Sequence, residues 1–377
     1  MTQLCQSFDY QVNIKIKRTI EYKQLLGKYK KMKKALFLFP KSYTLLDNFK
    51  SIFQHAGYEV LNIDYADFFS PSEKKIHHYL LKMPWNIRWA VLEKINKTVN
   101  IRYKEIFEEQ KPDIVFTYND QKLVKDTVAY FNEKSTTAFF LGDNPLFIKN
   151  RPDNLAAILE GNHIFSPDSY WLTQLKILGA ESVHFLIPGY AKKLNYEKAI
   201  SNEDVKKWGA DIVFIGNQYH DTWGYKRALF ANLFVGQNFK VYGDLAWTKW
   251  FRYFPDLEKH FTLNQTYLPF ETVNTILNAS KVYPIDANSG LINGLHTRIF
   301  ETIGSGVLPL VEYRKDLETV FDGVEIPVIH NYNQAKNLAI EYINKDEKRS
   351  QLIQNLQKFI DQKYTDAEVG KQIFNKL

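Results

Sequence analysis

The sequence predicts an α/β protein built from two consecutive Rossmann-like domains, each a doubly wound parallel sheet, that face one cleft. Three observations predict this fold class. From Ala35 onward, short apolar strands alternate with amphipathic helices, which is typical of parallel sheets. A polar, lysine-rich segment at 191–209 interrupts the alternation, which then restarts. The chain has 377 residues, which is too long for one compact core and favours two domains.

The first domain is expected to hold six strands. Their ranges are 35–40, 58–65, 112–120, 136–145, 163–168 and 182–190. The helices between them include one that ends at Gly57 and a long helical region over about 72–110. In such sheets ligands bind beyond the carboxyl ends of the strands, where Asn119-Asp120, Asp143-Asn144 and Pro188-Gly189 fall.

The second domain repeats this design after the polar segment. Its expected strands are 210–217, 239–244, 281–287, 307–312 and 325–330, with helices over 225–234, 269–280 and 296–306 and a helical tail from Gln334. The predicted organisation is a basic extension over 1–33, a first domain over 34–192, a second domain over 193–355 and a C-terminal helix over 356–377. Whether that last helix packs back on the first domain stays open.

The composition excludes several classes of protein. A single cysteine, Cys5, excludes a disulfide framework and a cysteine metal cluster, and it suits a reducing compartment. No uncharged apolar run reaches the ~18 residues of a membrane span. The N-terminus lacks the apolar core of a secretory signal, so the expected location is the cytoplasm.

The net charge of +7 belongs to the N-terminal extension. Residues 1–34 carry nine Lys or Arg against Asp9 and Glu21, whereas the remaining acidic and basic residues balance. Such an extension suits peripheral contact with the anionic inner face of a membrane, or a nucleic acid, and a solvated tail is an equal alternative. The body of the chain has no basic stripe with interleaved aromatics, so we expect no nucleic-acid partner there.

The first candidate ligand site is the strand-to-helix turn "DIVFIGNQYHDTWGYKRAL", residues 211–229. An apolar strand ends at Gly216, a polar loop follows, and Lys226 and Arg227 begin the next helix. Glycine allows close approach of a ligand to the backbone, and a helix N-terminus offers amides to phosphate. Many ordinary strand-helix turns share this pattern.

The second candidate site is "NGLHTRIFETIGSGVLPLVE", residues 293–312. If the helix begins near Leu295, the amides of 293–296 are placed to receive a diphosphate, with Arg298 adding a charge-assisted contact. Glu301 lies one turn further and is suited to accept hydrogen bonds from a ribose diol. The alternative is an ordinary surface Arg-Glu pair. Because Glu301 stands between apolar residues on a helix expected to be buried, the ligand interpretation is favoured.

The segments 210–217, 225–233, 240–244 and 294–321 resemble the C-terminal half of GT-B glycosyltransferases, and they are most similar to the CgeB-like, or spore-maturation-protein-like, group. The hallmark is an Arg-x-Phe-Glu helix, here starting at Arg298, followed by a small-residue turn that contains glycine. The resemblance covers about residues 136–330. It implies a nucleotide-sugar donor held by the second domain, an acceptor held by the first, and no bound metal or other cofactor. The sequence also contains no Asp-x-Asp motif and no His, Asp or Glu cluster at metal spacing.

The resemblance also implies roles for individual residues of the second domain. Gly216 and Asn217 would line the donor phosphates, with Arg227 or Lys226 offsetting their charge. Gly243 would lie under the base or ribose. The stretch that begins at Asn293-Gly294 would place Arg298 at the diphosphate and Glu301 on the ribose. Related retaining enzymes carry a glutamate where this chain has Asn293, so the stereochemical outcome is open.

In the first domain the candidate catalytic residues are Asp143, in "FLGDNP", and then Asp120, in "TYND". Each follows a predicted strand and is placed to bind or deprotonate an acceptor hydroxyl. Each also suits a helix cap or an Asx turn. The aromatic and basic stretch 77–94 is expected to be core, with a surface for lipid-linked acceptors or a membrane as the alternative. For the Trp-rich stretch 245–254, core, an acceptor platform and a dimer contact all stay open.

These features together predict a metal-independent glycosyltransferase of surface-polysaccharide or glycoconjugate biosynthesis. It would transfer a sugar from a nucleotide diphosphate sugar to a saccharide, lipid-linked or protein acceptor. The alternatives are a nucleotide-sugar epimerase of the same fold and a non-catalytic protein that binds a nucleotide sugar or a glycan. The neutral Asn293 keeps the last alternative open.

Overall fold

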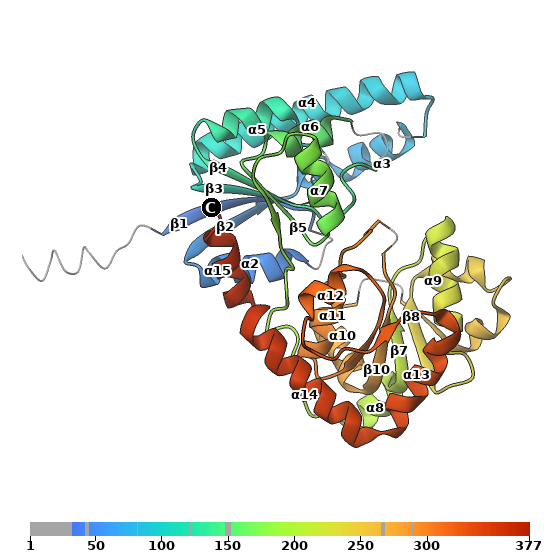
Figure 1. The fold of residues 1–377 in the computed structure, drawn as a ribbon. Coiled ribbons are helices and arrows are strands. Elements are labelled where there is room, and N and C mark those ends of the chain that lie inside the picture. The colour runs from blue at the N-terminus through green and yellow to red at the C-terminus, as the bar shows by residue number, and fades with distance from the viewer. Residues whose placement is uncertain are drawn as a thin grey trace, which may run out of the picture.

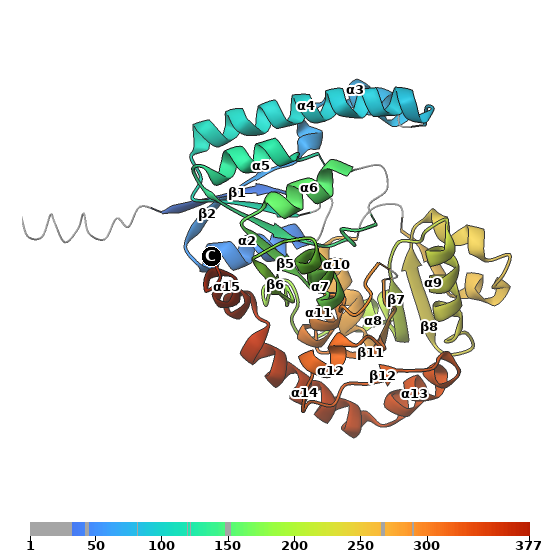
Figure 2. The same ribbon diagram turned by 45° about the horizontal axis from the view of Figure 1, so that its top comes forward.

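The structure is a computed structural model that describes residues 32–41, 45–80, 82–118, 120, 122–147, 152–264, 268–288 and 290–377. It contains two parallel six-stranded sheets, one in each domain, with helices on both faces (Figures 1 and 2). The predicted α/β class with two doubly wound domains is confirmed. The predicted basic extension lies almost entirely outside the described residues.

The first sheet has the strand order β2-β1-β3-β4-β5-β6. Its strands are β1 (Lys33–Leu38), β2 (Tyr58–Ile63), β3 (Ile114–Tyr118), β4 (Thr136–Phe140), β5 (His163–Ser166) and β6 (Val183–Phe185). Every residue of β3 is buried, because helices cover both faces. Alternate residues of β1 serve different cores: Leu36 and Leu38 pack on one face of the sheet, and Ala35 and Phe37 on the other.

Different helices cover the two faces of this sheet. One face packs against side chains of α4 (Trp85–Gln110), α5 (Lys125–Asn132), α6 (Pro152–Glu160) and α7 (Ser169–Ile177). The other packs against α2 (Leu45–His55) and α15 (Asp366–Phe374), the last helix of the chain. A short helix, α3 (Pro71–Leu80), precedes α4, and together they replace the single long helical region expected there.

The second sheet has the order β12-β11-β10-β7-β8-β9. Its strands are β7 (Ala210–Ile215), β8 (Phe239–Gly243), β9 (Phe261–Leu263), β10 (Ser280–Ile285), β11 (Leu308–Glu312) and β12 (Val328–Ile329). The chain adds β8 and β9 on one side of β7 and then returns to the other side with β10. The strand order therefore reverses between β7 and β10, which is the position where open α/β sheets bind ligands.

The connections of the second domain include several short elements. Its helices are α8 (Asn202–Trp208), α9 (Thr222–Asn232), α10 (Phe270–Asn278), α11 (Arg298–Gly304), α12 (Asp316–Val320), α13 (Tyr332–Asn344) and α14 (Asp346–Lys363), and two 3-10 helices are η2 (Leu245–Trp250) and η3 (Pro255–His260). The sequence missed β9 and α8, and it placed the start of α11 three residues early, near Leu295.

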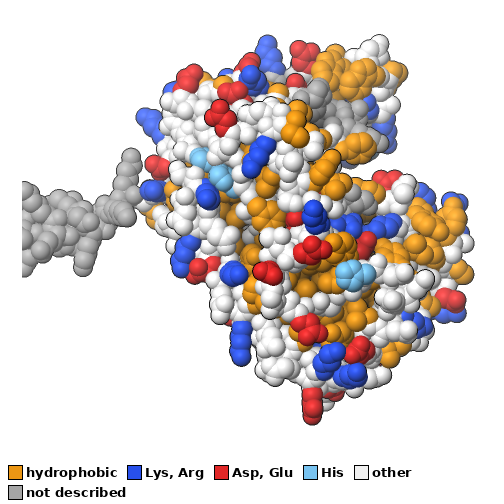
Figure 3. Space-filling model, viewed as in Figure 1, with side chains coloured by type: hydrophobic (Ala, Val, Ile, Leu, Met, Phe, Trp, Pro, Cys, Tyr) orange, Lys and Arg blue, Asp and Glu red, His pale blue; other side chains and the backbone are white. Residues whose placement is uncertain are grey.

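The chain crosses between the domains twice, at neighbouring points. Tyr190, on the outward crossing, donates its amide to the carbonyl of Tyr364, on the return crossing, at 3.0 Å. Gly189 is tightly fitted there, since a Cβ on it would lie 2.0 Å from that carbonyl oxygen. After the return crossing, α15 packs on α2, with Asp366 accepting a hydrogen bond from Ser51 at 2.5 Å. The space-filling view is hollowed between the two domains on its right side (Figure 3).

The carboxyl edges of the two sheets meet at Asp168, which follows β5 and is completely buried. Its Oδ2 accepts the amides of Ile292, Asn293 and Gly294, at 2.6, 3.1 and 3.1 Å. Its Oδ1 accepts the first amides of α7, as an N-cap does. Ser169 adds a bond from its hydroxyl to Asp316 of α12, at 2.6 Å. One carboxylate therefore caps a helix and joins the two domains.

Candidate functional site

A pocket of about 220 Å³ lies in the second domain at the carboxyl end of β7. It is bordered by the loops after β7 and β10, by α11 and by the start of α10. Five residues expected at the donor site line it: Gly216, Asn217, Arg227, Arg298 and Glu301. The pocket therefore coincides with the reversal point of the strand order, and two arginines stand within it.

Arg298, the first residue of α11, reaches the end of β7. Its Nη1 donates to the carbonyl of Ile215 and, at 3.0 Å, to the hydroxyl of Tyr283. Its Nε and Nη2 have no hydrogen-bond partner among the described residues. Burial acts to lower the pKa of this guanidinium, but Tyr283, Glu301 and Asp286 outweigh burial, so the pKa is raised. Arg298 thus offers a permanent charge and two further nitrogen donors to a ligand.

Arg227, on α9, is fixed by a buried ion pair. Its Nε and Nη2 donate to the two carboxylate oxygens of Asp286, at 3.0 and 3.2 Å, and its Nη1 donates to the carbonyl of Asn217 at 2.6 Å. Burial raises the pKa of Asp286, but Arg227 and Lys226 outweigh burial, so the pKa is lowered. The bidentate pair gives the guanidinium one orientation beside the loop that follows β7.

Gly216 provides close access to both guanidinium groups. A Cβ at this position would lie 3.0 Å from Nη1 of Arg227 and 3.2 Å from Nη1 of Arg298. The missing side chain therefore leaves open the space over the strand end where the two cations converge. An anionic group placed there would meet both of them, which suits a diphosphate.

Glu301 lies one turn after Arg298 on α11, and its carboxylate is unpaired. Among the described residues it has no hydrogen-bond partner and no ion pair within 4.0 Å. Burial raises its pKa, and the charge of Arg298 partly offsets this. A partly buried carboxylate with open acceptor sites is suited to a ligand that brings hydroxyl donors.

His296 is a further polar group of this pocket. Its Nδ1 accepts the amide of Arg298 at 3.1 Å, so the neutral ring carries its proton on Nε2. Burial, and then the charge of Arg298, lower the pKa of His296 from 6.5 to about 3. The imidazole is therefore a neutral hydrogen-bond donor at physiological pH.

The shifted pKa of His296 predicts a pH-dependent stability. Because the folded ring binds its proton only near pH 3 and the unfolded ring near pH 6.5, the free energy of unfolding should fall as pH is lowered from 6.5 towards 3. Urea unfolding at neutral pH and at about pH 5 measures this loss. In the variant His296→Gln the loss should be smaller. An identical pH dependence in both proteins would contradict the buried, neutral ring.

Part of the pocket lining is apolar. Leu268, Phe270, Val273 and Leu277 contribute to it from α10 and the segment before it. Tyr219 also lines the pocket, with its ring 5.4 Å from the guanidinium carbon of Arg227. The lining thus combines two guanidinium groups with apolar and aromatic side chains, which suits a nucleoside diphosphate.

Two residues expected to bind the donor do not line this pocket. Lys226 donates to Glu312 and to the carbonyl of Ala287, at 2.5 and 2.8 Å, so it joins α9 to neighbouring strand ends. Gly243 lies against the indole of Trp247, and a Cβ there would lie 2.2 Å from Nε1 of that ring. This Nε1 donates to the carbonyl of Gly216 at 2.8 Å. Gly243 therefore leaves space for the indole that holds Gly216 at the edge of the pocket.

Three of the four amides expected to receive the diphosphate are engaged in this structure. Those of Asn293 and Gly294 donate to Asp168, and that of Leu295 donates to the carbonyl of Pro167 at 3.3 Å. Gly294 packs so closely on this segment that a Cβ would lie 2.5 Å from the Pro167 carbonyl. In this arrangement the loop docks on the first domain, and these three amides are not available to a diphosphate.

The two candidate catalytic aspartates occupy different environments. Asp120 is buried, accepts the hydroxyl of Tyr103, and accepts the amide of Lys122 at 2.8 Å, which is the Asx-turn alternative. Burial raises its pKa, and these hydrogen bonds partly offset it. Asp143 is partly exposed in the loop after β4, at the carboxyl edge of the first sheet. Of the two, only Asp143 is accessible to an acceptor.

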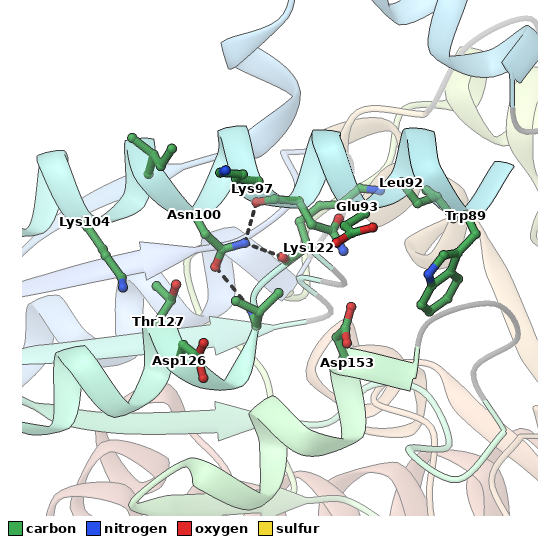
Figure 4. Close-up of a pocket in the computed structure, with 13 residues that line it drawn as sticks. Trp89, Leu92, Glu93, Lys97, Asn100, Lys104, Lys122, Asp126, Thr127 and Asp153 are labelled. Carbon is green, nitrogen blue, oxygen red and sulfur yellow. Dashed lines mark hydrogen bonds between the residues drawn. The ribbon is translucent and has the colours of Figure 1, made fainter. Parts of the chain in front are cut away.

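A second pocket, of about 490 Å³, lies on the first domain between α4 and the N-terminal ends of α5 and α6 (Figure 4). Asn100 bridges its wall: its Nδ2 donates to the carbonyl of Lys122 at 2.8 Å, and its Oδ1 accepts the amide of Val124 at 3.2 Å. Aromatic and charged side chains line it, including Trp89, Glu93, Lys97, Lys122, Asp126 and Asp153. This pocket offers hydroxyl-binding groups on the first domain, where the resemblance implies an acceptor.

Several residues of the donor-side pocket were not expected from the sequence. Tyr283 lies in a predicted strand and Phe270 in a predicted helix, and neither of them had a predicted role in the site. Asn264 and Asn288 also line the pocket. Their loops lack a glycine-rich or charged motif, so only the folded arrangement reveals them. Across the described ranges, no three His, Cys, Asp or Glu side chains converge in a way that could hold a metal ion.

Comparison with known proteins agrees with this geometry. Residues 225–375 match the family model described as glycosyl transferase-like. No curated protein matches the chain by sequence. Among solved structures, HepE of Anabaena in complex with UDP-glucose is similar at a TM-score of 0.61 and 13% identity, with 91% of this chain and 98% of that chain covered. The fold is GT-B.

Two further structures share this fold. Sucrose-phosphate synthase of Thermosynechococcus elongatus matches with a TM-score of 0.62 and 10% identity, covering 91% of this chain and 98% of that chain. A putative UDP-N-acetylglucosamine 2-epimerase of Listeria monocytogenes matches with a TM-score of 0.55 and 13% identity, covering 90% and 94%. The chain thus spans nearly the whole length of these two-domain proteins.

Proposed function

We propose that this protein is a glycosyltransferase of the CgeB-like branch that takes its sugar from a nucleotide diphosphate sugar. The observation that carries the proposal is the pocket at the end of β7, where Arg298 and Arg227 converge beside an unpaired Glu301. The glycosyl transferase-like match over 225–375 includes all three residues. The UDP-glucose bound to HepE makes UDP-sugars the first donors to test.

The residues suggest how the donor is held. The diphosphate lies over Gly216, between the two guanidinium groups, and the ribose hydroxyls donate to Glu301. The base lies against the apolar and aromatic lining, beside Tyr219 and Phe270. Two fixed arginines neutralise the leaving diphosphate, so the proposal requires no metal or other cofactor.

In the transfer step, the bond between the anomeric carbon and the diphosphate breaks, and a bond to an acceptor hydroxyl oxygen forms. The hydroxyl proton passes either to a base of the first domain, for which Asp143 is the candidate, or to the leaving phosphate. The acceptor is a saccharide, a lipid-linked sugar or a protein of surface-polysaccharide or glycoconjugate assembly. An epimerase remains the second candidate, because the Listeria structure shares the fold.

A thermal-shift comparison tests the donor site. Wild-type protein is heated with UDP, GDP, dTDP, CMP and ADP, and one of them is expected to raise the melting temperature. At a hundred times its dissociation constant, a ligand adds about 2.7 kcal/mol to the free energy of unfolding. Glu301→Ala should reduce the affinity by about tenfold or more, because it removes charge-assisted hydrogen bonds to the ribose.

The matched control is Glu271→Ala, on the exposed surface of α10, which should leave the shift unchanged. If no nucleotide shifts the folded wild-type protein, the donor site is rejected and a glycan-binding role is favoured. If nucleotide binds but neither sugar transfer nor donor hydrolysis follows with crude acceptors, the non-catalytic alternative is favoured.

A further inference from the structure

The hairpin formed by α3 and the first two turns of α4, residues 71–91, carries apolar side chains that no described part of the fold covers. No described residue of this segment is buried, whereas α4 becomes buried from Leu92 onward. The core interpretation of the stretch 77–94 is therefore wrong up to residue 91. An apolar surface of this kind on a folded domain marks an interaction site.

The exposed apolar side chains are large. Tyr79 is 68% exposed, Ile76 56% and Trp85 50%. Trp85 lies 5.2 Å from the ring of Trp89, centroid to centroid. In the space-filling view, hydrophobic side chains gather at the upper right, where the free end of the α3–α4 hairpin lies (Figures 1 and 3). Tryptophan and tyrosine are the residues that favour the interface between lipid and water.

The charge of the hairpin is positive. Lys74, Lys75, Lys82 and Arg88 stand on it, and its one carboxylate, Glu73, accepts hydrogen bonds from the amide and hydroxyl of Ser70, just before α3. Basic side chains beside exposed aromatic ones complement an anionic lipid surface. They do not suit an apolar protein partner, for which uncompensated lysines would be buried at a cost.

An apolar groove of about 830 Å³ runs between the two helices. Phe69, Ile76, Leu80, Ile87 and Val91 are among its lining residues. A groove of this composition, open beside basic side chains, is suited to an acyl chain with an anionic headgroup. The groove and the exposed tip thus favour the same kind of partner.

The second domain presents a related surface on the same side of the molecule. Leu245 is 67% exposed and Tyr253 50% exposed, and the nearby Lys249 and Arg252 add positive charge. The α3–α4 hairpin and the α9–η2 region both project to the right in Figures 1 and 2, one from each domain. A planar partner could therefore touch both domains at once.

We propose that the α3–α4 hairpin docks this protein on the surface of an anionic lipid bilayer. Helices among the described residues are too short or too polar to cross a bilayer, so this docking is peripheral. It would hold the molecule at the lipid headgroups, where a lipid-linked acceptor is within reach. That last consequence rests on the proposed function, whereas the docking itself does not.

Vesicle co-sedimentation of the full chain tests the proposal. Wild-type protein is mixed with vesicles of phosphatidylglycerol and phosphatidylcholine, or of phosphatidylcholine alone, without donor or acceptor. Binding is expected only to the anionic vesicles, and it should weaken as salt is added. Binding should fall about tenfold or more in Tyr79→Ser/Trp85→Ser, and also in Lys74→Gln/Lys75→Gln.

The matched control is Ile177→Ser/Lys176→Gln, which removes an equally exposed apolar residue and a lysine from α7 and should bind like wild type. A third variant neutralises Lys28, Lys30 and Lys31 in the basic extension, and it should still bind. The proposal is overturned if wild type ignores anionic vesicles, or if the hairpin variants bind like wild type. It is also overturned if sedimentation of the protein alone shows a dimer that the hairpin variants dissociate, while vesicles are not bound.

The two proposals can fail separately. The nucleotide-induced thermal shift should be intact in Tyr79→Ser/Trp85→Ser, and vesicle binding should be intact in Glu301→Ala. Loss of both activities in either variant would indicate misfolding, which the melting temperature without ligand reveals. In that case the double variant Lys74→Gln/Lys75→Gln, which changes two side chains on an exposed helix, tests the docking by its binding to anionic vesicles.

Discussion

Replacing Arg298 by alanine is expected to weaken nucleotide binding by about thirtyfold or more, measured by isothermal titration calorimetry. Removing one partner of a buried, hydrogen-bonded charge pair costs about 2–5 kcal/mol. The diphosphate would form such a pair with Arg298, because the raised pKa keeps the guanidinium charged and two of its nitrogens lack a partner among the described residues. The nucleotide affinity of Arg298→Lys should lie between those of wild type and Arg298→Ala, since lysine keeps the charge but not the forked geometry.

Two controls separate ligand binding from structural support. Tyr283→Phe removes the hydroxyl that accepts a bond from Arg298 and donates to Ile215, so it tests the support alone. Lys226→Gln removes a cation that is paired with Glu312 outside the pocket. Both variants should bind nucleotide nearly as wild type does. If Lys226→Gln were as damaging as Arg298→Ala, the diphosphate would lie at the start of α9 instead.

The fold could be predicted from the sequence because its signal is local. The inner strands of the two sheets are short, mostly apolar runs, since helices cover both faces. Short edge elements lack this signal. For example, β9 (Phe261–Leu263) is three residues long and partly exposed, so its pattern resembles a loop.

The site could be predicted only in part. Arg227, Arg298 and Glu301 meet in one pocket, as the motif spacing suggested. Lys226 and Arg227 could not be separated, because the sequence does not show which of two neighbours on a helix, about 100° apart, faces the ligand. The structure turns Arg227 to the pocket and Lys226 to Glu312.

The backbone amides after β10 show a second reason why the site could not be fully predicted from the sequence. The pattern Asn293-Gly294 before a helix favoured a phosphate cradle, but these amides donate to Asp168 of the other domain. That contact joins residues more than a hundred positions apart in the sequence. No local pattern encodes it, so the sequence assigned to a ligand the donors that the fold uses to join its domains.

Asp168→Ala is expected to lower the free energy of unfolding by about 2–5 kcal/mol, measured by urea unfolding, because it removes both an N-cap and the acceptor of several buried amides. The variant leaves three amides of the second domain without a partner and removes the N-cap of α7. Ser169→Ala, which removes the neighbouring contacts with Asp316 and Asn293, should cost less, since the carboxylate of Asp168 stays in place.

The nucleotide affinity of Asp168→Ala then decides what the released amides do. If the diphosphate lies on Arg298 and Arg227, the affinity should be unchanged, although the protein is less stable. If instead the affinity rises, the amides of Ile292, Asn293 and Gly294 are ligand donors that Asp168 occupies in the unliganded protein. A variant that unfolds like wild type would show that this carboxylate does not hold the domains together in solution. The free energy of unfolding thus tests whether these backbone amides join the two domains, and the nucleotide affinity tests whether they bind the ligand.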